Sequence, residues 1–276
     1  MRFNFLVEIK KTLARNNSRS GLVQLSQNVV SAFTRPMIFL TLVSVLISVA
    51  MNFYVRHWQY QKWEENRQVF YLEDGTPLFT TTDASYFLGV AQALKRDGSS
   101  ESFHEKQSYY AEKKEKNTFD KKEQRLRDAP LLSVLLSMMA SDSSVETLLK
   151  VGNLIIPATA MLTALMIVFA FGVAGFWLEG SIAAAGAGLS GAYLNRSSAG
   201  RIDTDQLNLG FFYFMTGLII LAARAESFRL SLLLATFAGT VFWVFDWWYP
   251  KPLFGWAFFI GLIWLSIFNK VEKKRI

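Results

Sequence analysis

The chain has 276 residues, of which 51% are hydrophobic and 15% aromatic, with 24 Phe, 8 Trp and no Cys. Long apolar stretches almost free of charge are not normal in a soluble domain of this length, and they indicate a membrane-embedded protein. The absence of Cys excludes disulfides and thiolate metal sites, so a bound metal would need oxygen or nitrogen ligands. The formal net charge of +7 fits either nucleic acid or an anionic membrane surface, and the positions of the charges separate the two.

About six segments are long and apolar enough to cross roughly 30 Å of hydrocarbon. They are Met37–Val55, Val151–Phe171, Trp177–Leu194, Leu207–Ala223, Leu230–Phe245 and Leu253–Phe268. The polar leader before the first segment ends in no small-residue cleavage site, so this segment is interpreted as a retained signal anchor. We therefore predict an all-α polytopic membrane protein with about six transmembrane helices and a large first extracytoplasmic loop.

The basic residues of the short flanks fall in three clusters, which precede the first span, separate the fourth from the fifth, and follow the sixth. They are Arg2, Lys10, Lys11, Arg15, Arg19 and Arg35, then Arg224 and Arg229, then Lys270, Lys273, Lys274 and Arg275. With an even number of spans all three clusters lie on one side, which the positive-inside rule makes the cytoplasm. This distribution explains the positive charge by the membrane, and no nucleic acid is expected as a partner.

The resulting topology places the protein in the cell (inner/cytoplasmic) membrane as a multi-pass protein with both termini in the cytoplasm. We expect a cytoplasmic N-terminal segment at 1–36, a first span at 37–55, an extracytoplasmic loop at 56–150, a bundle of about five spans at 151–268 and a cytoplasmic tail at 269–276.

The large loop is predicted to contain ordered helical pieces. Arg56–Arg67 continues the first helix beyond the membrane and places Trp58 and Trp63 at the interface. Asp83–Lys95 has apolar residues at a helical period, and Pro130–Met139 is predicted to be an amphipathic helix too short to span the bilayer. The first of these two helices would be capped by Thr82 or by Asp83.

Two aspartates one residue apart lie in the tight turn expected between the third and fourth spans. Asp203 and Asp205 follow Arg196 and Arg201. An Asp-x-Asp pair on a turn offers oxygens to a hard divalent cation such as Mg²⁺ or Mn²⁺, and arginine is shaped to hold phosphate oxygens. The alternative is that these are turn residues and a cap for the fourth helix. Charges at an otherwise apolar membrane junction favour the functional interpretation.

A third carboxylate, Asp83, is expected on the same side of the membrane as the Asp-x-Asp pair. Taken alone, Asp83 is more typical of a helix cap than of a metal ligand. Its position matters because carboxylates from two loops on one face can converge on a single ion.

At these positions the chain resembles the catalytic subunits of oligosaccharyltransferases, which N-glycosylate asparagine. Asp83-Ala84-Ser85-Tyr86-Phe87 resembles the Asp-x-x-Tyr-[Tyr/Phe] element of the family's first outer loop. The stretch Tyr193–Asp205 is similar to the second-loop motif, in which Asn-Arg precedes a Gly and then Asp-x-Asp. The run Trp247-Trp248-Tyr249-Pro250 after the fifth span is also similar to the family, and we expect it to anchor a helix end at the membrane interface. The resemblance extends over nearly all of the chain from Met37 onward.

The resemblance implies a fold of the membrane glycosyltransferase C-superfamily type and a metal-dependent, inverting glycan transfer. The donor would be a polyprenyl-diphosphate-linked oligosaccharide, and the acceptor the Asn amide of Asn-x-Ser/Thr in a polypeptide. Asp83 and Asp203 would bind Mg²⁺ or Mn²⁺, Asp205 would support that site, and Arg196 would orient the acidic loop. Asp83 would also hydrogen-bond the acceptor amide and weaken its conjugation, so that positioning contributes more than proton removal.

The family also has an acidic ligand in a later outer loop and a C-terminal soluble domain with a Trp-Trp-Asp motif, whereas this sequence ends at Ile276. We therefore expect an N-terminal part of a truncated or split enzyme, with a missing C-terminal half as partner and no transfer by this chain alone. One alternative is a polyprenyl-phosphate-dependent membrane glycosyltransferase with a lipid or glycan acceptor. Another is a non-catalytic membrane scaffold subunit, in which loss of the aspartates would change only stability.

Overall fold

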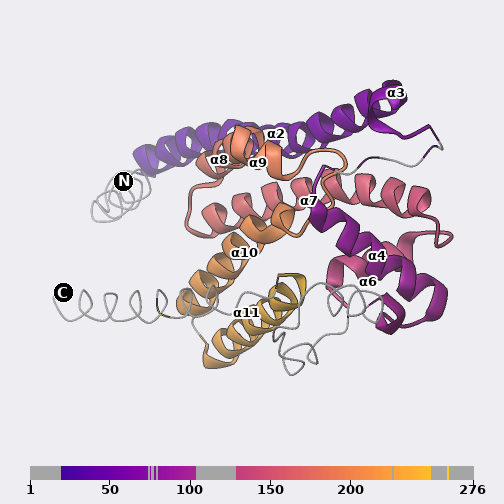
Figure 1. The fold of residues 1–276 in the computed structure, drawn as a ribbon. Coiled ribbons are helices and arrows are strands. Elements are labelled where there is room, and N and C mark those ends of the chain that lie inside the picture. Colours follow the sequence, from indigo (N-terminus) through magenta and orange to yellow (C-terminus); the bar gives the residue numbers. More distant parts are fainter. Residues whose placement is uncertain are drawn as a thin grey trace.

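The computed structural model describes residues 20–103 and 129–249, apart from 74, 76, 77, 79 and 226, together with residue 260; residues 20–36 are described by their backbone alone. The described part is built from helices (Figure 1). They are α2 (Ser20–Glu65), α3 (Arg67–Phe70), α4 (Thr82–Asp97), α6 (Leu131–Met139), α7 (Val145–Val173), α8 (Trp177–Leu189), α9 (Gly191–Arg196), α10 (Asp205–Arg224) and α11 (Phe228–Trp248).

Four helical segments of the described part are long and apolar enough to cross a membrane. They are Met37–Glu65 within α2, and the whole of α7, α10 and α11. The chain is therefore an all-α, membrane-embedded protein, as the hydropathy pattern predicts. The sixth expected span, Leu253–Phe268, lies outside the described residues except for residue 260.

Helix α7 is the centre of the bundle. It packs against α2, α8 and α10, and α11 packs on α10 (Figure 1). More than half of the most apolar window of α7 is buried inside the protein, whereas α2 and α11 leave most of theirs exposed. Exposed apolar side chains on a spanning helix are suited to contact with lipid, so the two outer helices have the character of lipid-facing elements.

The third expected span is not one helix. The chain breaks at Ser190, which has extended backbone angles (φ −61°, ψ 139°) between α8 and α9. The Ser190 hydroxyl donates to the Ala187 carbonyl (2.8 Å) and accepts from the Tyr193 N–H (3.4 Å). Helix α8 has 13 residues, which is about 20 Å of helix and less than the hydrocarbon thickness. The prediction of a continuous helix over Trp177–Leu194 is therefore wrong, because a single serine among small apolar residues leaves the hydropathy unchanged.

Helices α4 and α6 pack on one another and on the first turns of α7, at the end of the bundle where α2 ends (Figure 1). We call this the loop end. Both helices lie where the sequence predicts them, and α2 continues without interruption to Glu65 as expected. The cap of α4 is Thr81, whose hydroxyl accepts from the Ala84 N–H (3.2 Å). The predicted cap at Thr82 or Asp83 is therefore wrong, and Asp83 lies in the first helical turn.

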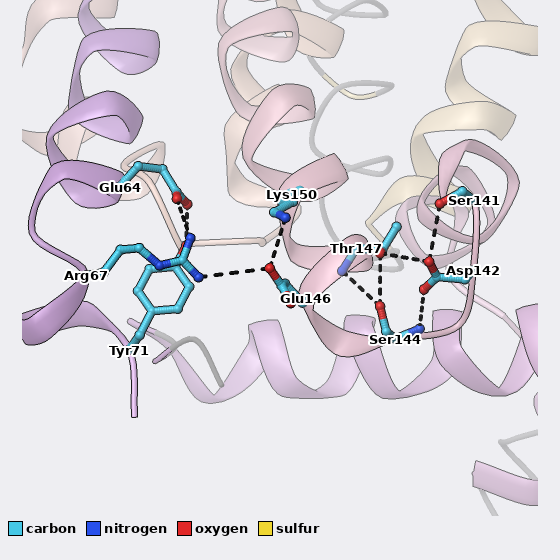
Figure 2. A network of polar contacts seen from close by, with 9 residues as sticks. All are labelled: Glu64, Arg67, Tyr71, Ser141, Asp142, Ser144, Glu146, Thr147 and Lys150. Atoms are coloured by element: carbon cyan, nitrogen blue, oxygen red, sulfur yellow. Dashed lines mark hydrogen bonds and ion pairs between the residues drawn. The ribbon is translucent and has the colours of Figure 1, made fainter. Parts of the chain in front are cut away.

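A network of charges joins the end of α2 to the start of α7 at the loop end (Figure 2). Arg67 pairs with Glu64 (2.8 Å), extends towards Glu146 on α7 (3.9 Å) and lies over the Tyr71 ring, 4.0 Å from its centroid. Burial, and then the hydrogen bond to Glu64, raise the pKa of the Tyr71 phenol. Lys150 completes the network by pairing with Glu146 at 2.9 Å.

Candidate functional site

Residues 197–205, which we call the acidic loop, connect α9 to the first turn of α10. An apolar anchor holds this loop against the bundle. Ile202 is 1% exposed and belongs to the main hydrophobic core together with Leu136 and Leu148. It packs directly on Gly152 of α7, where an added Cβ would lie 2.2 Å from the Ile202 Cδ1. Because the Ile202 side chain lies this close to the α7 backbone at Gly152, the loop has little freedom to move relative to α7.

Gly200 makes the central turn of the acidic loop with a positive φ of 71°. Its N–H donates to the Asn153 Oδ1 on α7 at 2.7 Å. The Trp63 ring of α2 covers the Gly200 Cα so closely that a Cβ would lie 1.6 Å from the Trp63 Cη2. Trp63 is only 5% exposed because its ring packs on the loop, whereas Trp58 is 47% exposed.

Arg56 of α2 holds the start of the loop. Its Nε donates to the Ser197 Oγ (2.9 Å) and its Nη2 to the Gly188 carbonyl (2.8 Å), while the guanidinium lies 5.0 Å from the centroid of the Tyr193 ring. A third donor, Nη1, bonds the carbonyl of Asn52 at 3.0 Å. The side chain is 1% exposed. Arg56 is the first residue of the predicted outer loop, 56–150. A cation beside the last carbonyls of α8 is favourable because the C-terminus of a helix carries partial negative charge.

Gln206 holds the other end of the loop at the start of α10. Its Nε2 donates to the Arg201 carbonyl (2.6 Å), and its Oε1 accepts from the Thr159 hydroxyl of α7 (3.0 Å). The Gln206 carbonyl accepts from the Thr163 hydroxyl (3.1 Å) and from the Tyr193 hydroxyl. Each polar atom of the Gln206 side chain thus has a partner, as a side chain only 1% exposed requires.

Asp203 is the most buried of the three predicted ligands, with 6% of its surface exposed. Its Oδ1 accepts from the Thr204 N–H at 2.6 Å, and its Oδ2 lies 3.8 Å from the Arg201 guanidinium. Burial raises the pKa of the Asp203 carboxyl, and the negative charges of Asp205 and Asp83 raise it further. Asp83, exposed on the first turn of α4, is therefore close enough to Asp203 for its charge to act there.

Asp205 is paired with Arg196, which the sequence motif singles out: the Arg196 Nη1 lies 2.6 Å from the Asp205 Oδ2. This ion pair connects the last residue of α9 to the first residue of α10 and so closes the loop at its base. Asn208, one turn along α10, donates from its Nδ2 to the other Asp205 oxygen (3.3 Å). The Asn208 Oδ1 is buried and has no hydrogen-bond partner.

The donor set has the chemistry that a hard divalent cation requires. In the part of the chain that the structure describes, no three His, Cys, Asp or Glu side chains are close enough together, as they stand, to hold a metal ion. The negative charges of Asp205 and Asp83 nevertheless raise the pKa of the Asp203 carboxyl, and the amide oxygen of Asn208, a residue that bonds Asp205, lacks a donor. Oxygen ligands with excess negative charge are those that Mg²⁺ and Mn²⁺ prefer, so these residues fit such an ion.

Sequence reasoning missed the side chains that hold the acidic loop. One signal was present: Asn153 and Gln206 are uncharged polar residues inside or next to apolar spans, where such residues usually have a partner. No local signal marks Trp63, because its contact with Gly200 joins segments far apart in the chain. Comparison with known proteins adds nothing to the geometry, since no protein-family model and no curated protein matches the chain.

Proposed function

We propose that this chain supplies the acidic part of an oligosaccharyltransferase active site, which transfers a glycan from a polyprenyl diphosphate to Asn in Asn-x-Ser/Thr. The observation that supports this proposal most strongly is the meeting of two sequence-distant segments. The charge of Asp83 on α4 raises the pKa of the Asp203 carboxyl, as does that of Asp205, at one end of a membrane bundle. A structural turn or a helix cap does not need carboxylates from a second segment.

In this proposal Asp83 and Asp203 hold Mg²⁺ or Mn²⁺, and Asp205 supports them. When bound, the cation offsets the charge of the diphosphate leaving group. Arg196 holds Asp205 in place through its ion pair. Asp83, which is exposed, accepts a hydrogen bond from the acceptor amide and fixes it. An amide nitrogen is a poor nucleophile because its lone pair is delocalised, so fixing and twisting the amide contributes more than removing its proton.

The same proposal places the acidic loop on the extracytoplasmic face of the cell membrane. The basic clusters around Arg224 and Arg229 then lie in the cytoplasm, at the opposite ends of α10 and α11. The remaining ligands and the acceptor-binding domain that the family requires would come from a second polypeptide or from sequence beyond Ile276.

The test is glycan transfer by the Asp203→Asn variant. The chain is expressed together with the product of the reading frame that follows it in its genome, and transfer from a lipid-linked donor to an Asn-x-Thr peptide is measured. We expect a loss of at least about 100-fold, because removal of one electrostatic group from such a site costs about 10²–10³ in rate. The control is Asp142→Asn, an exposed carboxylate at the loop end that bonds Ser144 and Thr147; it should retain transfer.

Three other outcomes would contradict the proposal in different ways. Full transfer by Asp203→Asn would remove the assigned site. Transfer from a polyprenyl monophosphate to a lipid or glycan, with none to the peptide, would favour the related membrane glycosyltransferases. Absence of any transfer in the wild type, with Asp203→Asn changing only thermal stability, would favour a non-catalytic scaffold subunit.

A further inference from the structure

The end of α11 contacts the acidic loop near its C-terminal end, at Thr204. The Trp248 Nε1–H donates to the Thr204 carbonyl at 2.7 Å. Trp248 is 1% exposed and Thr204 is 4% exposed, so this hydrogen bond is shielded from water. The sequence analysis expects the aromatic run at this position to anchor a helix end at the membrane interface. The Trp248 ring is inside the protein, where it belongs to the main hydrophobic core.

Trp248 holds the residue that separates the two aspartates. Thr204 lies between Asp203 and Asp205, and its N–H donates to the Asp203 carboxylate at 2.6 Å. Thr204 is thus fixed on both sides, through its carbonyl by Trp248 and through its N–H by Asp203. An indole has a single donor, and a buried tryptophan usually gives it a partner. Rotation of the Thr204–Asp205 peptide group would leave the indole N–H without its acceptor.

The neighbouring tryptophan provides a comparison within the same helix turn. The Trp247 Nε1–H donates to the Ala129 carbonyl at 2.9 Å. The two side chains have the same chemistry and each makes one hydrogen bond to a backbone carbonyl. They differ in their target, because Ala129 precedes α6 whereas Thr204 belongs to the acidic loop.

We propose that Trp248 is a positioning residue for the carboxylates, which keeps the Asp203-Thr204-Asp205 backbone in the orientation that presents both side chains to a divalent cation. This inference rests on the proposed function for the identity of the ligand. The hydrogen bond itself does not depend on that function, so its effect on the loop can be measured separately.

The experiment uses the full chain in detergent micelles and compares Trp248→Phe with Trp247→Phe. Mn²⁺ affinity is measured by titration calorimetry, and hydrogen exchange is measured on peptides that cover residues 197–205. Removal of a side chain that orients a ligand typically weakens metal binding about 10- to 100-fold. We expect that loss, and faster exchange in the loop, for Trp248→Phe alone. Trp247→Phe should match the wild type in both measurements.

Further variants separate positioning from packing. Phe211→Leu trims a ring whose centroid lies 6.5 Å from that of Trp248 and leaves the indole N–H in place. If it weakens Mn²⁺ binding as much as Trp248→Phe does, packing explains the effect and the inference is overturned. If Trp248→Phe does not fold, Trp248→His is compared with Trp247→His under the same criteria.

The two proposals fail in distinguishable ways. Wild-type protein that binds no Mn²⁺ would contradict the proposed function, while faster loop exchange in Trp248→Phe would still support the positioning role. Wild-type affinity and wild-type exchange in Trp248→Phe would overturn the positioning role and leave the proposed function standing.

Discussion

Two features of the structure restrict position 200 of the acidic loop to glycine, its backbone conformation and its contact with Trp63. Its φ of 71° lies in the left-handed region, and the Trp63 ring occupies the space of a side chain. Gly200→Ala is expected to lower the free energy of unfolding by about 2–4 kcal/mol, from about 1 kcal/mol of backbone strain and the rest from overpacking. Denaturant unfolding in micelles measures this.

The control for this variant is Gly98→Ala, because Gly98 has the same φ of 71° but nothing within 4 Å of an added Cβ. It should lose only the part due to backbone strain. Equal losses at the two positions would show that the Trp63 contact does not restrict the loop.

Individual site residues were predictable to different degrees. Arg196, Asp203 and Asp205 lie within ten residues of the chain, so a sequence motif can identify them. The ion pair of Arg196 with Asp205 lies within that motif. Asn153 and Trp248 contribute to the same loop through hydrogen bonds from other helices. Contacts of that kind depend on how helices pack, and neither hydropathy nor spacing encodes helix packing.

At the scale of elements, Arg56 connects α2 to the broken segment α8–α9. Arg56→Lys is expected to lower the free energy of unfolding by about 1–3 kcal/mol, because one ammonium does not reproduce the fork that bonds Ser197 and Gly188 and a buried acceptor loses its donor. Arg67→Lys serves as control. Arg67 has a 45% exposed side chain and pairs with Glu64, three residues earlier at the end of α2, so a change within about 0.5 kcal/mol is expected. Similar losses for both variants would argue against a special role for Arg56.

The elements themselves were predictable where one periodicity dominates. Helices α4 and α6 follow from apolar residues at helical spacing, and the four long apolar helices follow from hydropathy. The break at Ser190 did not follow, because an average over a window of about 20 residues does not register a change of backbone angle at one residue. The cap of α4 was displaced by one or two residues, since Thr81, Thr82 and Asp83 are all good capping residues and the local structure selects among them.

For the whole molecule, the orientation in the membrane is the feature with the most direct test. The chain contains no Cys, so single cysteines can be introduced without background. In intact cells, a membrane-impermeant maleimide should label Ser141→Cys at the loop end. Ser227→Cys, which precedes α11 at the opposite end, should react only after permeabilisation. The reverse pattern would place the acidic loop in the cytoplasm and contradict an extracytoplasmic active face.

The hydrogen bond from Trp248 to Thr204 also has a consequence for synthesis of the chain. The two residues are 44 positions apart, and ribosomes add about 5–20 residues each second, so roughly 2–9 seconds separate them. The partners from α2 and α7 are translated before the loop. The nascent protein therefore carries the acidic loop for several seconds before Trp248 is made, and the Thr204 carbonyl gains this donor only after α11 has been synthesised.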